Sequence, residues 1–519
     1  MAKPEERTDP IEQNPNNDED DIDQETEEEE DDDDDEELES QQRKPPAGIE
    51  QLKLENLFRR LQNEKVLLRV HDVIIKGNTK TKDSLLEAET VLLKDASSLQ
   101  ELLEASKVVN FRLQSLDIFD SVKITLDSGP PELPQTANVV VEVVESSSPI
   151  SGEVGAYTKG EARSSTVEGS LKLKNIFGYG DLWDGSLAYG FDHMTEVSAG
   201  VYLPRFRQFV TPVTARVFLL SQDWEQFSSF KERSLGLSLG LFSTRNHNLF
   251  YNFAWRTMTD PSQVASKPVR RQLGHNLLSS LKYTFKIDCR NSSLRPVRGY
   301  AFVSTTHIGG LALDSRTLRF FRQEFDLRYA IPLGVYHSAL NIGISSGVIF
   351  PWGHGFLDMP SPLPERFFLG GNISPICTLG GPTAIWGFNT RGIGPTEPRR
   401  QLRNPSSENA NPGRDYLGGD LAVTAFADIS FDFPLEWCRT KGIHGHIFAS
   451  AGNVDKLTEK AYQNFSLSKF AKSVRSSVGV GIVVPTNLFR LEVNYCYMLK
   501  KFDHDHGKSG FRISFSTPS

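Results

Sequence analysis

The sequence of 519 residues lacks any apolar run near the roughly 20 residues that a membrane-spanning helix requires. It contains only four cysteines, and no two of them form a CxxC pair, so neither a zinc site nor a disulfide framework is indicated. The first residues lack the apolar stretch of a secretion signal and are too acidic for a transit peptide. We therefore expect no helical anchor, no metal site and no cleavable leader.

The charge of the chain is unevenly distributed. The formal net charge is −10, but residues 1–45 alone hold 22 Asp or Glu and 4 Lys or Arg, which leaves the remainder at +8. Like charges repel and this segment has nothing to bury, so residues 1–46 are expected to form a disordered acidic tail. Two roles remain open for it: a solvated tail, or a flexible bait for basic segments of a precursor protein.

Residues 47–147 have the composition of a compact α/β unit. The leucine spacing within 49–65 predicts a short amphipathic helix. One strand, two helices and two strands are then predicted, over residues 68–75, 81–93, 97–111, 121–126 and 137–144. Ser97 or Ser98 is the expected N-cap of the second of these helices, with Glu101 in its first turn. The order of elements is β-α-α-β-β.

From residue 148 to 519, helical periodicity gives way to alternation of apolar and polar residues, as in the segment 489–497. A soluble sheet would bury the apolar face inside, whereas a membrane barrel turns it toward lipid. Strand lengths near the ~9–11 residues of a tilted transmembrane strand favour the barrel. Aromatic residues near strand ends, such as Phe177 and Phe367, favour it too. We expect a transmembrane antiparallel β-barrel of about 16 strands.

Several motifs occur in an order that resembles a known family. One motif is typical of a strand and ends at Gly77 and Asn78. A second motif begins at Phe119 and is expected to form the loop that leads into the next strand. Residues 175–181 are similar to a first barrel hairpin. The segment 287–300 fits a mid-barrel D-x-R-x(4-5)-P-x-x-G signature, carried by Asp288, Arg290, Pro296 and Gly299. Later strands match at residues 365–371, 449–454 and 477–481.

Together these motifs resemble the POTRA-plus-barrel assembly proteins of bacterial, mitochondrial and chloroplast outer membranes. Segments 379–383, 391–395 and 415–419 are similar to the central barrel subunit of the mitochondrial sorting and assembly machinery. A single small domain, here an expected POTRA domain, also fits that branch, because the chloroplast relatives typically carry three. The resemblance implies a barrel with a lumen loop near residues 372–400.

The expected lumen loop departs from the family pattern in two places. The (V/I)-R-G-(F/Y) motif falls on Ile385-Trp386-Gly387-Phe388, with Trp where the family has an Arg that pairs with acids of the barrel wall. Either Arg391 substitutes for it with a different reach, or Trp386 simply packs against the wall. In addition, Leu-Gly-Gly occurs twice, at 369–371 and 379–381, which indicates a short insertion.

The C-terminal segment resembles a β-signal, the targeting segment of mitochondrial barrel proteins. Its polar-x-Gly-x-x-hydrophobic-x-hydrophobic pattern is carried by Lys508, Gly510, Phe511, Ile513 and Phe515. Gly510 would permit a kink or a close approach of another backbone. We expect these residues to form a client-binding seam with the strand near 154–157, because weakly paired first and last strands can template an incoming strand.

The expected function is insertion of β-barrel precursors into the mitochondrial outer membrane. The resemblance implies that the small domain faces the intermembrane space, that unfolded precursors, accessory subunits and the lipid bilayer are partners, and that nucleic acid is not. Neither a cofactor nor enzymatic activity is expected, and His504-Asp505-His506 is interpreted as a solvated turn, not as a metal site. The alternatives are a chloroplast outer-envelope translocation or assembly channel, a passive porin and a soluble lectin-like β protein.

Overall fold

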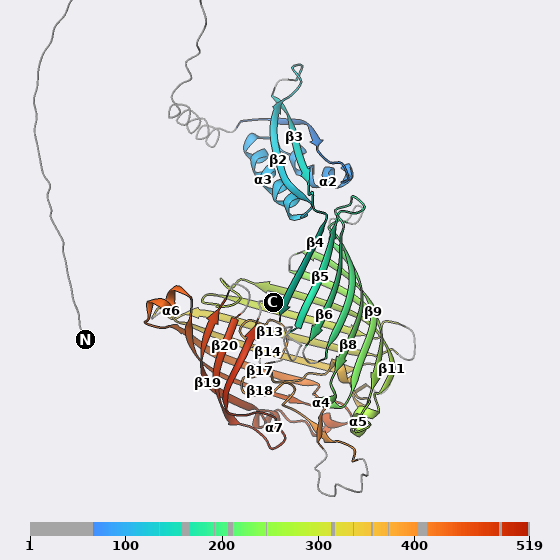
Figure 1. Ribbon diagram of the computed structural model, residues 1–519, viewed down its shortest axis with the longest axis vertical. Coiled ribbons are helices and arrows are strands. Elements are labelled where there is room, and N and C mark those ends of the chain that lie inside the picture. The colour runs from blue at the N-terminus through green and yellow to red at the C-terminus, as the bar shows by residue number, and fades with distance from the viewer. Residues whose placement is uncertain are drawn as a thin grey trace, which may run out of the picture. The chain divides into compact units, whose positions relative to one another are not determined.

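The computed structural model describes residues 66–516, apart from residues 134, 158–165, 191–192, 206–210, 245, 313–316, 336, 354–355, 372, 383, 402–412 and 487–489. The predicted acidic tail and the predicted helix over 49–65 lie outside the described residues. What is described forms a small α/β domain followed by one large antiparallel sheet (Figure 1). No helix in this part of the chain is long and apolar enough to cross a membrane.

The small domain has the predicted order of elements. These are β1 (Arg69–Lys76), α2 (Asp83–Lys94), α3 (Leu99–Ser115), β2 (Phe119–Ser128) and β3 (Thr136–Glu145). β3 lies in the centre of the sheet, parallel to β1 and antiparallel to β2. Leu86 and Leu113 of the helices are buried against Val141 of β3 in one core. As predicted, the Ser98 side chain caps α3 by accepting a hydrogen bond from the Glu101 backbone N–H.

The large sheet has sixteen strands, and all but one of its neighbouring pairs are consecutive along the chain. They are β4 (Ile150–Tyr157), β5 (Thr166–Lys174), β6 (Leu182–Gly190), β7 (Thr195–Leu203), β8 (Val213–Asp223), β9 (Lys231–Thr244), β10 (His247–Thr259), β11 (Gly274–Asp288), β12 (Gly299–Gly309), β13 (Phe320–Pro332), β14 (Ala339–Pro351), β17 (Leu421–Asp432), β18 (His444–Asp455), β19 (Arg475–Pro485), β20 (Arg490–Lys500) and β21 (Gly510–Ser516). This agrees with the predicted number of strands.

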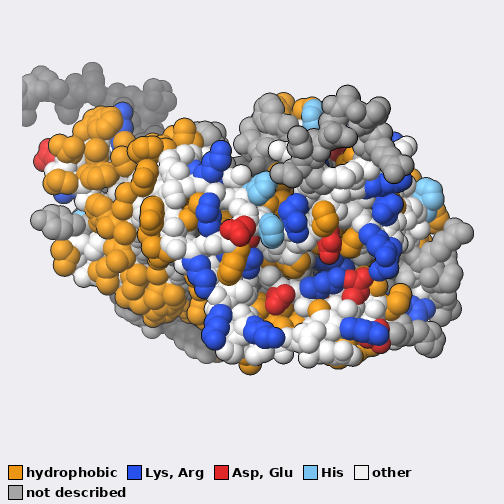
Figure 2. Space-filling view, turned by 90° about the horizontal axis from the view of Figure 1, so that it is seen from below, with side chains coloured by type: hydrophobic (Ala, Val, Ile, Leu, Met, Phe, Trp, Pro, Cys, Tyr) orange, Lys and Arg blue, Asp and Glu red, His pale blue; other side chains and the backbone are white. Residues whose placement is uncertain are grey.

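Apolar side chains point outward from this sheet. In β20, Val493, Tyr495 and Tyr497 are 37–55% exposed, whereas Glu492 and Asn494 between them are at most 2% exposed. An apolar exterior with a polar interior is the arrangement of a membrane barrel. Figure 2 shows part of this hydrophobic exterior beside a face on which Lys and Arg side chains gather.

Short elements lie in the connections between strands. The helices are α4 (Glu225–Ser228), α5 (Lys267–Arg270), α6 (Glu436–Thr440) and α7 (Leu467–Lys472), with 3-10 turns η1 (Phe356–Asp358), η2 (Leu363–Glu365) and η3 (Ala461–Asn464). Between β14 and β17, a separate pair is formed by β15 (Thr396–Pro398) and β16 (Arg414–Tyr416). The whole connection between β14 and β17, residues 352–420, contains residues 372–400, where the lumen loop is expected. From here on, the lumen loop means this whole connection.

Three details differ from the expectations. Residues 175–181 join β5 to β6, the second and third barrel strands, and are not the first hairpin. Phe119 is the first residue of β2, because it already pairs with Glu145, and so does not lie in a loop. Residues 365–371, expected in a later strand, lie in the lumen loop between β14 and β17, and Phe367 is buried there instead of lying near a strand end.

Candidate functional site

The sixteen-stranded sheet has two edges, β4 and β21. β4 pairs with β5 and β21 pairs with β20, and among the described residues no pairing joins β4 to β21. Val154 on β4 is 85% exposed, and Phe511 on β21 is 80% exposed. Both edges therefore present backbone donors and acceptors that another strand can pair with.

The C-terminal pattern singled out in the sequence lies on β21. Ile513 is opposite Val493 and Phe515 is opposite Leu491 on β20. Gly510 begins the strand with a φ of 143°, and a Cβ atom there would meet nothing within 4 Å. No other backbone of the described chain lies that close to the Cβ position of Gly510, so the positive φ is the reason for a glycine at this position. A close approach by the backbone of another chain stays a prediction. A client-binding role for these residues stays a prediction.

The lumen loop carries its own apolar core inside the barrel. Ile385 and Phe388 are completely buried and share a cluster with Leu369 and with residues of the wall. Gly387 has a φ of 89°, a conformation that side-chain-bearing residues rarely adopt. The interior is therefore filled by packed side chains around this segment.

Trp386, which stands where the family has an arginine, is 4% exposed. Its ring centroid lies 4.4 Å from that of Phe448 and 5.8 Å from that of Phe426, and it is also in ring contact with His446. These residues belong to β17 and β18, so Trp386 packs against the wall. The sequence left open whether Arg391 substitutes for the family arginine or Trp386 packs against the wall. The second alternative describes the position of Trp386.

The wall acids close to this tryptophan are paired within the wall. His446 Nδ1 lies 2.7 Å from Asp428 Oδ1, and Arg490 Nε donates to Glu492 Oε1 at 2.7 Å. A buried carboxylate with a cationic or hydrogen-bonding partner has less need of a further arginine from the loop. The match between Trp386 and the wall is incomplete, because Asp428 Oδ2 and Trp386 Nε1 are buried without a hydrogen-bond partner among the described residues.

Arg391 does not take the place of the family arginine, which would pair with acids of the barrel wall. Its guanidinium lies 3.3 Å from the ring centroid of Trp224 and 3.8 Å from that of Phe368, and Nη1 donates to Ser228 Oγ at 3.5 Å. Cation–π contacts of this kind fix a desolvated arginine between aromatic rings. Arg391 therefore holds the lumen loop to the loop between β8 and β9.

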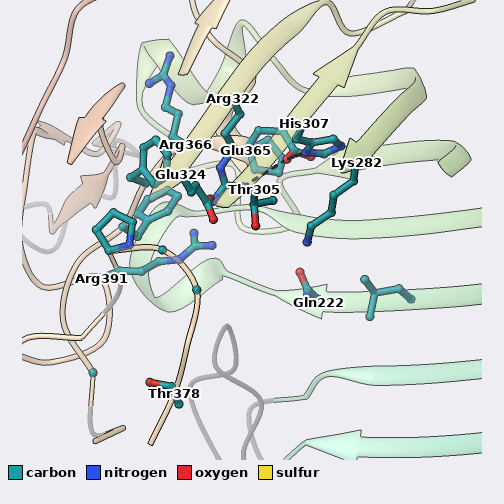
Figure 3. A pocket seen from close by; sticks show the side chains of 18 of the residues that line it. Gln222, Lys282, Thr305, His307, Arg322, Glu324, Glu365, Arg366, Thr378 and Arg391 are labelled. Carbon is teal, nitrogen blue, oxygen red and sulfur yellow. Dashed lines mark ion pairs between the residues drawn. The ribbon is translucent and has the colours of Figure 1, made fainter. Parts of the chain in front are cut away.

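A polar cavity of about 760 Å³ lies between the lumen loop and the wall strands β8–β13. Figure 3 shows Lys282 and Arg391 reaching into it, with Glu365 among cationic side chains at one end. Arg256 Nη2 donates to Glu365 Oε1 at 2.9 Å, and Arg322 Nη1 lies 3.6 Å from Glu365 Oε2. The sequence reasoning did not single out Glu365, although an acid just before Arg-Phe-Phe at the start of a glycine-rich loop was a usable signal.

The mid-barrel signature forms the turn between β11 and β12. Arg290 makes a two-pronged contact with Asp288, at 2.9 Å and 2.8 Å, and its Nη1 donates to the Ile376 carbonyl of the lumen loop at 3.0 Å. Pro296 is buried, and Gly299 begins β12 with a φ of 112°. The signature thus connects this turn to the lumen loop.

The signature residues of the small domain form a tight turn after β1. Gly77 has a φ of 93°, and a Cβ atom there would lie 2.0 Å from the Val143 carbonyl oxygen. Asn78 Nδ2 donates to the Thr81 carbonyl at 3.0 Å and to Asp83 Oδ1 at 2.6 Å. The glycine is required by space, and the asparagine orders the start of α2.

The turn between β5 and β6 contacts this part of the small domain. Asn175 Nδ2 donates to Thr81 Oγ1 at 2.8 Å, and the Lys82 backbone N–H donates to the Gly178 carbonyl at 2.9 Å. The Lys82 ammonium also lies 3.6 Å from the ring centroid of Tyr179. Two motifs found separately in the sequence therefore meet in space.

His504 and His506 are exposed and His504 lies in a turn, as expected, but Asp505 between them is buried. Asp505 accepts from Arg475 Nε at 3.0 Å, and the His506 ring lies 5.2 Å from that of Tyr416. The burial of Asp505 was not expected, because its partner comes from β19. The segment is part of the contact between the β20–β21 connection and the lumen loop.

That contact continues onto the last strand. The Asn389 N–H donates to the His506 carbonyl, and the His506 N–H donates to the Gly392 carbonyl, both at 2.8 Å. Arg512 of β21 donates to Asn389 Oδ1 at 2.9 Å and to the Phe388 carbonyl at 3.3 Å. The strand with an unpaired outer edge is thus held from inside the barrel by the lumen loop.

Comparison with known proteins gives relatives over most of the chain. Sorting and assembly machinery component 50 homologs of Xenopus tropicalis and Homo sapiens are each 29% identical, over 84% of this chain and 87% of the relative. A SAM50-like protein of Schizosaccharomyces pombe is 25% identical over 90% of this chain and 96% of the relative. These matches confirm the predicted resemblance to the mitochondrial sorting and assembly branch.

A solved structure shares the fold. BamA from Haemophilus ducreyi lacking POTRA domains 1-3 superposes with a TM-score of 0.68 at 16% identity, covering 87% of this chain and 84% of that one. The POTRA model, described as a surface antigen variable number repeat, matches residues 68–146. The model described as the Omp85 superfamily domain matches residues 175–518, well over half of the sequence. On this match, together with a sixteen-stranded barrel that follows a single POTRA domain, the chain belongs to the Omp85 superfamily.

Proposed function

We propose that this chain inserts β-barrel precursors into the mitochondrial outer membrane, through a seam between β4 and β21. The chain is an outer-membrane assembly protein and not an enzyme, in keeping with its relatives, one of which is the outer membrane protein assembly factor BamA of Neorickettsia risticii. The mitochondrial location is supported by the relatives named for the sorting and assembly machinery. The POTRA domain would face the intermembrane space and receive unfolded precursors.

The observation that carries the proposal is the pair of unpaired sheet edges. An edge strand offers a row of free N–H and C=O groups, and strand addition satisfies them without any covalent step. Inside a bilayer an unpaired edge is costly, because lipid cannot hydrogen-bond to it. The edges at β4 and β21 therefore favour pairing with an incoming strand over exposure to lipid.

The filled interior supports insertion over passive conduction. An empty barrel of sixteen strands would leave an aqueous channel. Here the lumen loop places a buried cluster that includes Leu369, Ile385 and Phe388 inside the wall. A strand that enters at the seam avoids this obstacle, whereas a solute on the barrel axis meets it.

Paired-cysteine cross-linking to an arrested barrel precursor tests the seam. Val154→Cys on β4 and Ile513→Cys on β21 are exposed positions on the two edges. Each is expected to cross-link to the precursor in isolated membranes, at the last strand of the client for one edge and at its first strand for the other. The matched control is Leu327→Cys, which is 49% exposed on β13 in the middle of the wall. Equal cross-linking at Leu327→Cys, or none at either edge with an import-competent client, would contradict the seam.

The location is tested separately by fractionation. Carbonate extraction and protease shielding of purified mitochondria and chloroplasts are expected to recover the chain in the mitochondrial membrane fraction. The POTRA domain should become accessible to protease only after the outer membrane is opened. Recovery from chloroplasts alone would replace the mitochondrial proposal with the envelope channel.

A further inference from the structure

We infer that Glu365 is a positioning residue for the last strand, and that it acts by holding the start of the lumen loop against strands β10, β12 and β13 of the barrel wall. This inference deepens the proposed function and rests on it for its consequence at the seam. The family pattern would place a loop cation against wall acids, at the position that Trp386 occupies here. In this chain the charges are reversed, since a loop acid pairs with wall cations.

The contacts of Glu365 reach three strands of the wall. Besides Arg256 on β10 at 2.9 Å and Arg322 on β13 at 3.6 Å, His307 Nδ1 on β12 lies 3.7 Å from Glu365 Oε2. The glutamate side chain is 9% exposed and that of Arg256 is 10% exposed. Arg256 is balanced on its other side by Glu232 of β9 at 2.8 Å. A nearly dry group of this kind has a defined geometry, unlike an ion pair in water.

The charges make this arrangement sensitive to the loss of the one loop acid. Glu365 approaches two arginines, and among the described residues each of them has a single further acid partner, Glu232 for Arg256 and Glu324 for Arg322. Removing the charge of Glu365 leaves cationic groups facing each other across a buried space, which is strongly unfavourable when a partner is missing. The start of the loop would then move away from the wall.

A series of isolated backbone bridges connects the segment that begins at Glu365 to the residues just before the last strand. Two residues on, Phe367 and Gly419 exchange backbone hydrogen bonds at 3.0 Å and 2.9 Å. Leu369 then bridges to Ile393, and Phe388 bridges to Gly507 in the connection before β21.

The final link in this path is Arg512 on β21. It donates to the Phe388 carbonyl and to Asn389, so the strand is attached to the same loop that Glu365 fixes. Among the described residues, no hydrogen bond or ion pair joins Glu365 itself to β21, so its influence runs through the loop. Glu365 is therefore placed as a positioning residue and not as part of the client-binding edge.

Hydrogen exchange measured by mass spectrometry on the full chain in nanodiscs, without client, tests the inference. Glu365→Gln keeps the shape of the side chain but removes its charge. Exchange is expected to become faster by at least about fivefold at the amides of Asn389, His506 and β21, as expected when a buried charge loses its partner. Exchange in the POTRA domain and in β5–β7 should remain unchanged. Glu365→Asp, which keeps the charge, should restore much of the protection.

Two controls make the result decisive. Glu397→Gln removes an exposed acid from the same loop, on β15, and should leave exchange at β21 unchanged. Arg322→Gln should produce part of the effect of Glu365→Gln, and the double variant should add little, because both remove the same contact. The inference is overturned if Glu365→Gln folds with unchanged exchange at β21, or if exchange rises equally throughout the barrel.

The outcome is separable from that of the proposed function, because no client is present during the exchange measurement. Faster exchange at β21 in Glu365→Gln supports the coupling even if no precursor cross-links to either edge. Unchanged exchange at β21 contradicts the coupling between Glu365 and β21 even if both edges cross-link to the client.

Discussion

Gly299 and Gly510, two glycines that the sequence motifs contain, have positive φ angles but very different surroundings. Gly299 has a φ of 112°, and a Cβ atom there would lie 2.2 Å from the Cys289 carbonyl oxygen. Gly510 has a φ of 143°, and a Cβ atom there would meet nothing. The first position is constrained by both conformation and space, and the second by conformation alone.

Alanine substitutions should separate these two effects. Gly299→Ala is expected to destabilise the barrel by more than about 2 kcal/mol, because strain and a backbone clash add. Gly510→Ala should cost about 1 kcal/mol, from backbone strain alone. Urea titration of the folded band on semi-native gels measures both. A Gly510→Ala variant less stable than Gly299→Ala would show that Gly510 has a close neighbour after all.

Glu145 is a second residue whose surroundings give a measurable consequence. Partial burial raises the pKa of its carboxyl, but hydrogen bonds from Thr79, Lys80 and Thr81 outweigh burial and lower the pKa from its ordinary value of 4.5 to about 2. Thr79 Oγ1 donates at 2.5 Å, and the Thr81 backbone N–H donates at 2.7 Å. The ionised carboxylate thus orders the turn that follows Gly77.

A depressed folded-state pKa gives a stabilisation that is present above the unfolded value of 4.5 and is lost as the pH falls toward about 2. Amide protection at Lys80 and Thr81, measured by hydrogen exchange, should therefore decline across that window. Glu145→Gln should show reduced protection at pH 7, by about 1 kcal/mol because the site is partly wet. Glu142→Gln on the exposed face of β3 is the control. A flat pH profile at these two amides would refute the role of Glu145.

At the scale of elements, the lumen loop and the wall have complementary surfaces. Trp386 occupies an aromatic site between β17 and β18, while the nearby acids Asp428 and Glu492 already have partners. An arginine at this position would lose the aromatic packing, and the one carboxylate oxygen of these two acids that has no hydrogen-bond partner in the described part of the chain is Asp428 Oδ2. We expect the lost packing to outweigh that single contact.

Trp386→Arg is therefore expected to destabilise the barrel instead of improving it. The cost should reach about 3–5 kcal/mol, the usual range for removing a large buried aromatic side chain, with the cost of burying a guanidinium in addition. Trp386→Phe, which keeps an aromatic ring, should cost clearly less. Urea unfolding of each variant in detergent gives the comparison. Equal stability of Trp386→Arg and wild type would mean that the wall can still accept the family arginine.

Most elements were predictable because alternation of apolar and polar residues reports directly on a sheet that is half exposed to lipid. β20, for example, follows the predicted alternating segment 489–497, with bounds that differ by a few residues. The lumen loop was recognisable only by resemblance, because its residues have no period. The position of Asp505 could not be predicted, since its partner Arg475 lies 30 residues away on another strand.

The same limit applies to the site. The edge at β21 was predicted because the first and last strands of a barrel are identified by their order along the chain. The contacts of Glu365 with Arg256 and Arg322 join residues 109 and 43 positions apart and depend on how the loop folds back. Sequence patterns describe residues that are close along the chain. The neighbours of Glu365 are far away in the sequence and are brought to it by packing.

At the scale of the whole molecule, the lumen loop determines what can pass along the barrel axis. Intact protein in planar bilayers is expected to conduct weakly, because packed side chains fill much of the interior. Deleting residues 373–392 should raise the conductance at least severalfold, toward that of an open barrel of this size. Heat-modifiable gel mobility would verify that the deletion variant still folds. A large, steady conductance of the intact chain would favour the passive porin.

Among the described residues, β4 pairs with β5 alone and β21 with β20 alone. A client strand that pairs with either of them has a free edge of its own on the far side, and that edge can pair with the next client strand. A hybrid sheet can therefore grow at the seam one strand at a time. Release would be timed by the client, at the moment when its own first and last strands come close enough to pair with each other.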